Sequence, residues 1–88
     1  MKFSREYYTS AMVAEITGVT SHVLRYWEQH HHFIKPRRVR DGSQRLYRPV
    51  DIALLQKVKR LADFGVTHKG INKLYQSYGT KEFLKLEL

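Results

Sequence analysis

Cysteine is absent from this chain of 88 residues, so a disulfide framework and metal sites built from thiolates are excluded. Long apolar stretches are missing too, because no run approaches the roughly 20 residues that a transmembrane helix needs. The N-terminal segment MKFSREYY lacks the apolar core of a signal peptide. From these absences we expect a soluble, cytoplasmic protein that does not enter a membrane.

Acidic residues are scarce as well. Aspartate and glutamate number 8 against 16 lysines and arginines, which gives a formal net charge of +8. Such an excess in a small chain predicts a polyanionic partner, with nucleic acid as the first candidate and an anionic membrane surface as the second. The sequence also lacks a paired carboxylate set, a nucleophile beside a base and a phosphate-binding loop, so we expect neither an enzyme nor a cofactor.

The stretch from Thr17 to Glu28 has the pattern of a helix-turn-helix. Gly18 suits a tight turn, and a helix is expected to start near Thr20. Leu24 and Trp27 share one side of that helix and are expected to be buried. The other side carries polar residues: His22, Arg25, Tyr26 and Gln29. A helix divided in this way is typical of the recognition helix that enters a DNA major groove.

A basic hairpin is predicted next. Pro36 prevents the helix from continuing, and Phe33 and Ile34 before it are expected to tuck under the fold. Asp41-Gly42 is a strong hairpin turn signal between two short extended pieces. Alternation places Leu46 on one face and its two neighbours in the chain on the other. The hairpin carries the densest positive patch of the sequence: Arg37, Arg38, Arg40, Arg45 and Arg48.

Further helices are expected around these two elements, in one domain with a modest core. The expected segments are a lead-in over residues 1–7, a first helix opened by Tyr8-Thr9-Ser10, a third helix from Pro49 to Phe64-Gly65 and a fourth from Thr67 to about Tyr78. The domain thus covers residues 8–78. Residues 79–88 begin a fifth helix that is too short to be stable alone, so it either docks on its own domain or starts a longer element.

Two ordered motifs resemble the N-terminal DNA-binding domain of the MerR family of bacterial transcription regulators. These are Leu24-Arg25-Tyr26-Trp27-Glu28 and Arg45-Leu46-Tyr47, separated by Lys35-Pro36 and a glycine turn. The resemblance covers about residues 8–78. It implies a mainly α fold, a winged helix-turn-helix of four helices with a small two-stranded antiparallel β wing and the start of a fifth helix. It also implies a recognition helix in the major groove and wing contacts to the backbone and minor groove.

The same resemblance implies partners besides double-stranded DNA. It implies a homodimer joined by a coiled coil if the chain continues past Leu88, and an indirect effect on RNA polymerase through a distorted promoter spacer. Trp27 and an extra residue between Glu28 and Lys35 are similar to the branch that includes light- and B12-responsive repressors, so activation is not assumed. Arg48 stands where a capping serine is common, which predicts a less firm start of the third helix.

We expect DNA contacts from the recognition helix, the wing and the start of the fourth helix. The expected residues are Ser21, His22, Arg25 and Tyr26, then Arg37, Arg38, Arg40, Arg45 and Tyr47, and finally Lys69. Arg25 has a planar donor fork that suits guanine or phosphate, and the alternative is a surface arginine paired with Glu28 or Asp51. Tyr47 is expected to contact a phosphate.

Several alternatives stay open. His22 is either a base contact or a solvated histidine, Tyr26 either a phosphate contact or a partly packed ring, and Thr67 either part of a phosphate clamp or only a cap. The side chains of His30-His31-His32 should diverge, and no metal site is expected there. Two other functions are also open, an excisionase-like architectural protein that bends DNA and an antirepressor module that binds an acidic protein.

Overall fold

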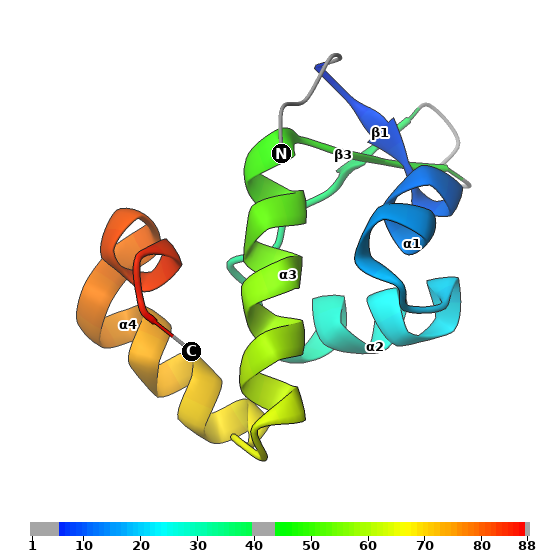
Figure 1. Ribbon diagram of the computed structural model, residues 1–88. Helices are drawn as coiled ribbons and strands as arrows, with labels where there is room; N and C mark the ends of the chain where they lie inside the picture. Colours follow the sequence, from blue (N-terminus) through cyan, green and yellow to red (C-terminus); the bar gives the residue numbers. More distant parts are fainter. Residues whose placement is uncertain (1–5, 40–43, 88) are drawn as a thin grey trace.

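The computed structural model describes residues 6–39 and 44–87. The elements of this part of the chain are, in order, β1 (Tyr8–Thr9), α1 (Ser10–Thr17), α2 (Ser21–His30), β2 (Arg37–Arg38), β3 (Arg45–Tyr47), α3 (Pro49–Asp63) and α4 (His68–Leu84). Figure 1 shows α3 in the middle of the molecule, with α1 and α2 on one side and α4 on the other. This mainly helical arrangement with a small antiparallel sheet confirms the predicted winged helix-turn-helix.

The helix-turn-helix forms as its local residues predict. Gly18 has φ 77° and its N–H donates to the Ala14 carbonyl at 2.9 Å, which closes α1. Thr20 then caps α2, because its hydroxyl accepts the Val23 N–H at 3.2 Å. Leu24 is fully buried against the rest of the core, so the turn fixes the angle at which α2 leaves α1.

The sheet contains one more strand than predicted. Its order is β1-β3-β2 and both pairs are antiparallel, with Tyr8 opposite Tyr47 and Arg38 opposite Arg45. Tyr8 therefore does not open the first helix. It lies in a strand that buries the tyrosine against β3, a pairing between distant segments that local patterns do not indicate. The predicted turn at Asp41-Gly42 lies outside the described residues.

The core gathers around α3, which supplies the apolar stripe that the sequence predicts. Its fully or almost fully buried side chains are Ile52, Leu54, Leu55, Val58 and Leu61. At the start of this helix, the buried carboxylate of Asp51 accepts the Arg48 N–H at 3.0 Å and the Lys35 N–H at 3.3 Å. It also pairs with the Arg48 guanidinium at 2.8 Å. Asp51 thus anchors the helix start even though no serine caps it.

The described part of the C-terminal segment docks on its own domain, one of the two predicted alternatives. Gly79 breaks the helical geometry of α4 with φ 75° and ψ 173°, and the chain then turns back toward α3 (Figure 1). Phe83 is fully buried, with its ring 5.4 Å from that of Tyr75 and 5.6 Å from that of Phe33. Lys57 donates from α3 to the Leu86 carbonyl.

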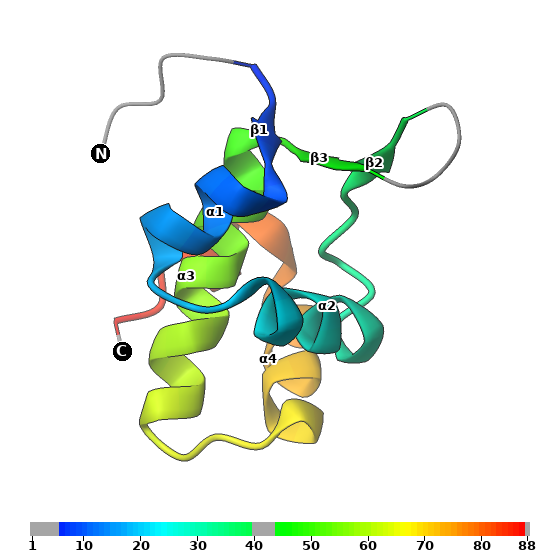
Figure 2. The same cartoon turned by 90° about the vertical axis from the view of Figure 1, so that its right-hand side faces the viewer.

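In the orthogonal view, the wing extends sideways from the top of α3, and residues 31–36 connect it to the end of α2 (Figure 2). Ile34 in this connection is buried, and Phe33 stacks on Tyr75 with ring centroids 4.0 Å apart. Both residues anchor the segment as predicted. Among the residues described, none of the helices has the length and apolar character needed to cross a membrane.

Candidate nucleic-acid interface

The exposed side of α2 is the one that the sequence predicts. Ser21, His22 and Arg25 are exposed, whereas Leu24 and Trp27 are buried. Arg25 makes no ion pair with any residue in the described part of the chain, and its two alternative partners are occupied elsewhere. Glu28 pairs with Arg45, and Asp51 pairs with Arg48. The guanidinium of Arg25 is therefore available to an external ligand.

Arg25 lies between two shallow hollows that border α2. One, of about 260 Å³, separates α2 from the wing and is also lined by Arg38 and Arg45. The other, of about 270 Å³, is also lined by Ser21 and His22. Hydrogen-bond donors and cations thus surround the exposed side of the helix on both flanks.

The wing arginines divide into two groups. Arg37 and Arg38 on β2 are exposed, and Arg37 lies 6.0 Å over the ring of Tyr7 and donates to its hydroxyl at 3.4 Å. Arg45 on β3 is largely buried and is held by Glu28, with Nε to Oε1 at 2.9 Å. Arg40 lies outside the described residues. Between the two described wing strands, the exposed cations thus lie on β2.

The predicted phosphate contact of Tyr47 is wrong for this arrangement. Tyr47 is only 1% exposed, and its hydroxyl donates to the carboxylate of Glu28 inside the protein. Burial, together with this hydrogen bond, raises the pKa of Tyr47 well above its ordinary value. The face of β3 that meets the helices is that of Arg45 and Tyr47, because Glu28 supplies acceptors for both.

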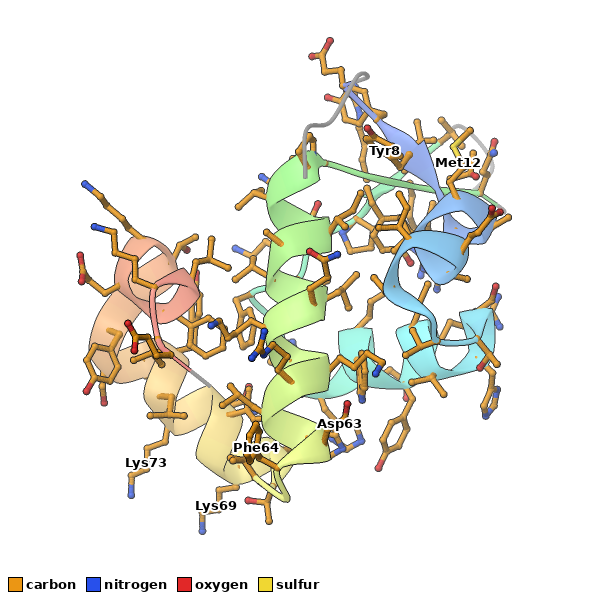
Figure 3. All side chains as sticks on the ribbon, in the orientation of Figure 1. Tyr8, Met12, Asp63, Phe64, Lys69 and Lys73 are labelled. Atoms are coloured by element: carbon orange, nitrogen blue, oxygen red, sulfur yellow. The ribbon has the colours of Figure 1, made fainter. Side chains whose placement is uncertain are left out.

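A further positive surface lies at the start of α4. Lys69 is exposed, as predicted, and Lys73 follows it one helical turn later. Figure 3 shows both lysines extending away from the body of the molecule. Thr67 caps the helix, since its hydroxyl accepts the Gly70 N–H at 3.1 Å. Lys73 was not among the predicted contacts, although its spacing from Lys69 would have indicated it.

A model described as MerR HTH family regulatory protein matches residues 8–78 of the chain. The chain belongs to the MerR family. It is 37% identical over 67 residues to the HTH-type transcriptional repressor CarH of Myxococcus xanthus, a match that covers 76% of this chain and 22% of CarH.

Two further relatives are both described as the HTH-type transcriptional regulator MlrA. The protein of Salmonella typhimurium strain LT2 is 31% identical over 75 residues, which cover 85% of this chain and 30% of that protein. The protein of Escherichia coli strain K12 is 36% identical over 59 residues, with coverages of 67% and 24%. This MerR-family chain thus spans less than a third of the length of these relatives.

His30 at the end of α2 and His31 directly after it join this helix of the MerR-family domain to α4. His31 is fully buried, and its Nδ1 lies 2.7 Å from Asn72 Oδ1 while its Nε2 lies 3.1 Å from His68 Nδ1. Asn72 Nδ2 donates to the His30 carbonyl at 2.8 Å, which directs Oδ1 toward His31. His31 Nδ1 therefore carries a proton, and His31 Nε2 accepts one from His68.

The neighbouring rings complete this junction. The ring of His30 stacks on that of His68 with centroids 4.4 Å apart. The ring of Tyr26 packs at a tilt against that of His30, also with centroids 4.4 Å apart. Tyr26 is 47% exposed, so it is partly packed and partly open to a ligand. Burial lowers the pKa of His31 and of His68 below the ordinary value. In the described part of the chain, no three histidine or acidic side chains are placed to hold a metal ion.

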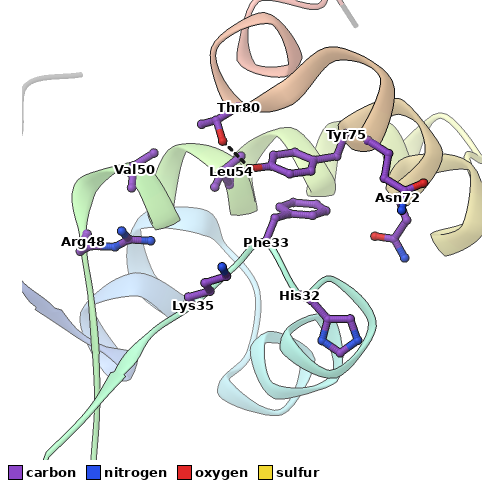
Figure 4. A pocket seen from close by; sticks show the side chains of 10 residues that line it. His32, Phe33, Lys35, Arg48, Val50, Leu54, Asn72, Tyr75 and Thr80 are labelled. Carbon is purple, nitrogen blue, oxygen red and sulfur yellow. Dashed lines mark hydrogen bonds between the residues drawn. The ribbon is translucent and has the colours of Figure 1, made fainter.

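A cavity of about 670 Å³ lies between α3, α4 and residues 31–36 (Figure 4). Its floor includes the stacked pair Phe33 and Tyr75, and Tyr75 shares a hydrogen bond with Thr80. Lys35 and Arg48 lie at its edge. Its lining includes none of the predicted DNA-contact residues, so it is distinct from the α2 surface.

Proposed function

We propose that this domain binds a specific site in double-stranded DNA and is the DNA-binding part of a transcription regulator. The observation that carries the proposal is the exposed guanidinium of Arg25, presented on a capped helix without an ion-pair partner among the described residues. A buried Leu24 and Trp27 on the opposite side hold that helix in place. The net charge of +8 supplies the general attraction for a polyanion.

In the proposed complex, α2 enters the major groove. Arg25 donates to the acceptor edge of a guanine or to phosphate oxygens, and His22 lies nearer the N-terminal end of the helix, which usually reaches the bases. Ser21 and Tyr26 lie at the edge of this surface and suit phosphate oxygens. Contacts of Arg25 and His22 with base edges account for sequence preference in this complex.

The remaining cations supply affinity that does not depend on sequence. Arg37 and Arg38 extend from the wing toward the backbone or minor groove, and Lys69 reaches a phosphate beside the start of α4. Arg40 stays a predicted contact from the hairpin turn. Because such contacts release counterions, the affinity should fall steeply with salt concentration.

We extend the proposal to promoter DNA, to a homodimer if the chain continues past Leu88, and to an indirect effect on RNA polymerase. The relatives support a regulatory role, because their descriptions name a transcriptional repressor and a transcriptional regulator. Their greater length is consistent with additional segments that this chain does not contain.

The decisive experiment combines selection from a random duplex library with footprinting on the promoter beside the gene. We expect one enriched motif and protection within a promoter. Arg25→Ala should broaden the motif, whereas the control Arg60→Ala, an exposed arginine on α3 beside Glu87, should leave it unchanged. Repeated protected sites at a recombination junction would favour the architectural function. Absence of salt-dependent duplex binding would refute DNA recognition and favour a protein partner.

A further inference from the structure

We infer that Glu28 is a positioning residue for DNA recognition, which fixes the wing against α2 and keeps Arg45 from binding phosphate. The inference rests on the proposed DNA binding. It assigns to an acidic residue, placed within a basic surface, the task of improving specificity while lowering affinity for DNA in general.

Both carboxylate oxygens of Glu28 accept hydrogen bonds from side chains of β3. Oε1 accepts from Arg45 Nε at 2.9 Å, and Oε2 accepts the hydroxyl proton of Tyr47. Residues two apart in a strand face the same side, so a single carboxylate on α2 holds two successive inward side chains of β3. The Glu28 side chain is only 10% exposed and that of Arg45 16%, so water screens this contact weakly.

The contact also sets the place of the exposed wing arginines. β2 pairs with β3, with Arg38 opposite Arg45 and Arg37 opposite Leu46. Because three strands of two or three residues are too short to hold their own position, they depend on the helices that they contact. By holding β3 against α2, Glu28 therefore fixes the distance between Arg25 on α2 and Arg38 on the wing.

The pair also removes one cation from the DNA-binding surface. Arg25 and Arg45 line the same two hollows, yet Arg45 is neutralised by Glu28 and Arg25 has no ion-pair partner among the residues described. Burial of the Tyr47 hydroxyl requires an acceptor, and Glu28 supplies it. Without the carboxylate, the Arg45 guanidinium would be free to turn toward a phosphate.

Glu28→Gln is the informative variant, because it retains the size and an acceptor for Tyr47 but removes the charge that holds Arg45. We expect tighter binding to random duplex DNA and a steeper salt dependence. The slope of log K against log salt concentration should become more negative by about 0.9, the value for one added phosphate contact. The ratio of affinities for the selected site and for random DNA should fall about tenfold, the effect of one misplaced base contact. Glu15→Gln on α1 is the matched control, since it removes the same charge from an exposed position.

A double variant tests whether Arg45 causes the change. In Glu28→Gln/Arg45→Met the salt dependence should return to that of the wild type, and Arg45→Met alone should leave it unchanged. If Glu28 only stabilised the fold, Glu28→Gln would lower the melting temperature but match Glu15→Gln in salt dependence and in specificity ratio. That result would overturn the inference.

Two further results keep the test decisive. If circular dichroism shows that Glu28→Gln does not fold, the test depends on Arg45→Met alone. A slope of log K against log salt concentration that becomes shallower by about 0.9 would show that Arg45 binds phosphate in the native protein, and it would refute the inference. An unchanged value would support it. A wild-type chain without salt-dependent duplex binding would instead refute the proposed function, before any variant is compared.

Discussion

Acidification should destabilise this protein through the contact between His31 and His68. Burial lowers the pKa of both histidines in the folded chain, so below about pH 6.5 the unfolded chain binds more protons than the folded one. The free energy of unfolding is therefore fully retained above that pH and decreases as the pH falls toward the folded-state pKa values. The effect is opposite in sign to that of a histidine that gains a carboxylate partner.

The hydrogen bonds limit how many protons the pair can accept. A first proton can bind His68 Nε2 without breaking a hydrogen bond, because His68 Nδ1 still donates to His31 across 3.1 Å. A second proton on His31 Nε2 would face that donor, and the contact must then open. His30 and His32 add repulsion when charged, which lowers the pKa of His31 further.

Linkage sets the size of the effect. Each histidine can change the free energy of unfolding by at most about 1.36 kcal/mol per pH unit, so the pair is limited to about 2.7 kcal/mol per pH unit. His68 is only half-buried and water screens its charge, so the larger share should come from the fully buried His31.

Urea unfolding at fixed ionic strength between about pH 8 and about pH 5 measures the effect directly. We expect a plateau at the alkaline end and a decline below about pH 6.5. His68→Asn should make the decline shallower, whereas His22→Asn, in an exposed position on α2 outside this histidine cluster, should not. A free energy of unfolding that stays constant over this range, or an equal effect of the two variants, would refute the reasoning.

Three other perturbations have defined outcomes. Arg25→Ala should cost about 1–3 kcal/mol at the selected DNA site and relax the preference for one base pair, measured by fluorescence anisotropy with substituted duplexes; an unchanged preference would leave Arg25 a phosphate contact at best. Arg38→Ala should weaken binding to all duplexes alike and make the slope of log K against log salt concentration shallower by about 0.9. An unchanged slope would show that Arg38 does not contact a phosphate. Phe83→Ala should lower the free energy of unfolding by about 3–5 kcal/mol in thermal or urea denaturation, because Phe83 is fully buried, and a loss below about 1 kcal/mol would contradict the docking of the C-terminal segment.

Local patterns in the sequence were sufficient for the helix-turn-helix. Gly18, the Thr20 cap and the buried pair Leu24 and Trp27 are each determined by residues within one or two helical turns. The exposed position of Arg25 follows from the same periodicity. These are the parts of the site that the sequence predicts correctly.

Contacts between distant residues were not predictable in this way. Glu28 and Tyr47 are separated by 19 positions and His31 and Asn72 by 41, so no spacing within an element indicates either pair. Alternation separated Leu46 from Tyr47 but could not determine which of the two faces the core. That choice depends on the carboxylate of Glu28, which comes from another element.

The recognition helix is consequently held at its C-terminal end by two polar contacts that lie outside its exposed face. Near its C-terminal end Glu28 binds the wing, and just beyond it His31 binds His68 on α4, which also begins the segment carrying Lys69. Both cation-bearing flanks are thereby fixed relative to Arg25. A rigid arrangement of this kind favours one DNA geometry over others, because flanks that could adjust would bind phosphates equally well on any sequence. Specificity in this domain should therefore be more sensitive to Glu28 and His31 than their distance from the bases would indicate.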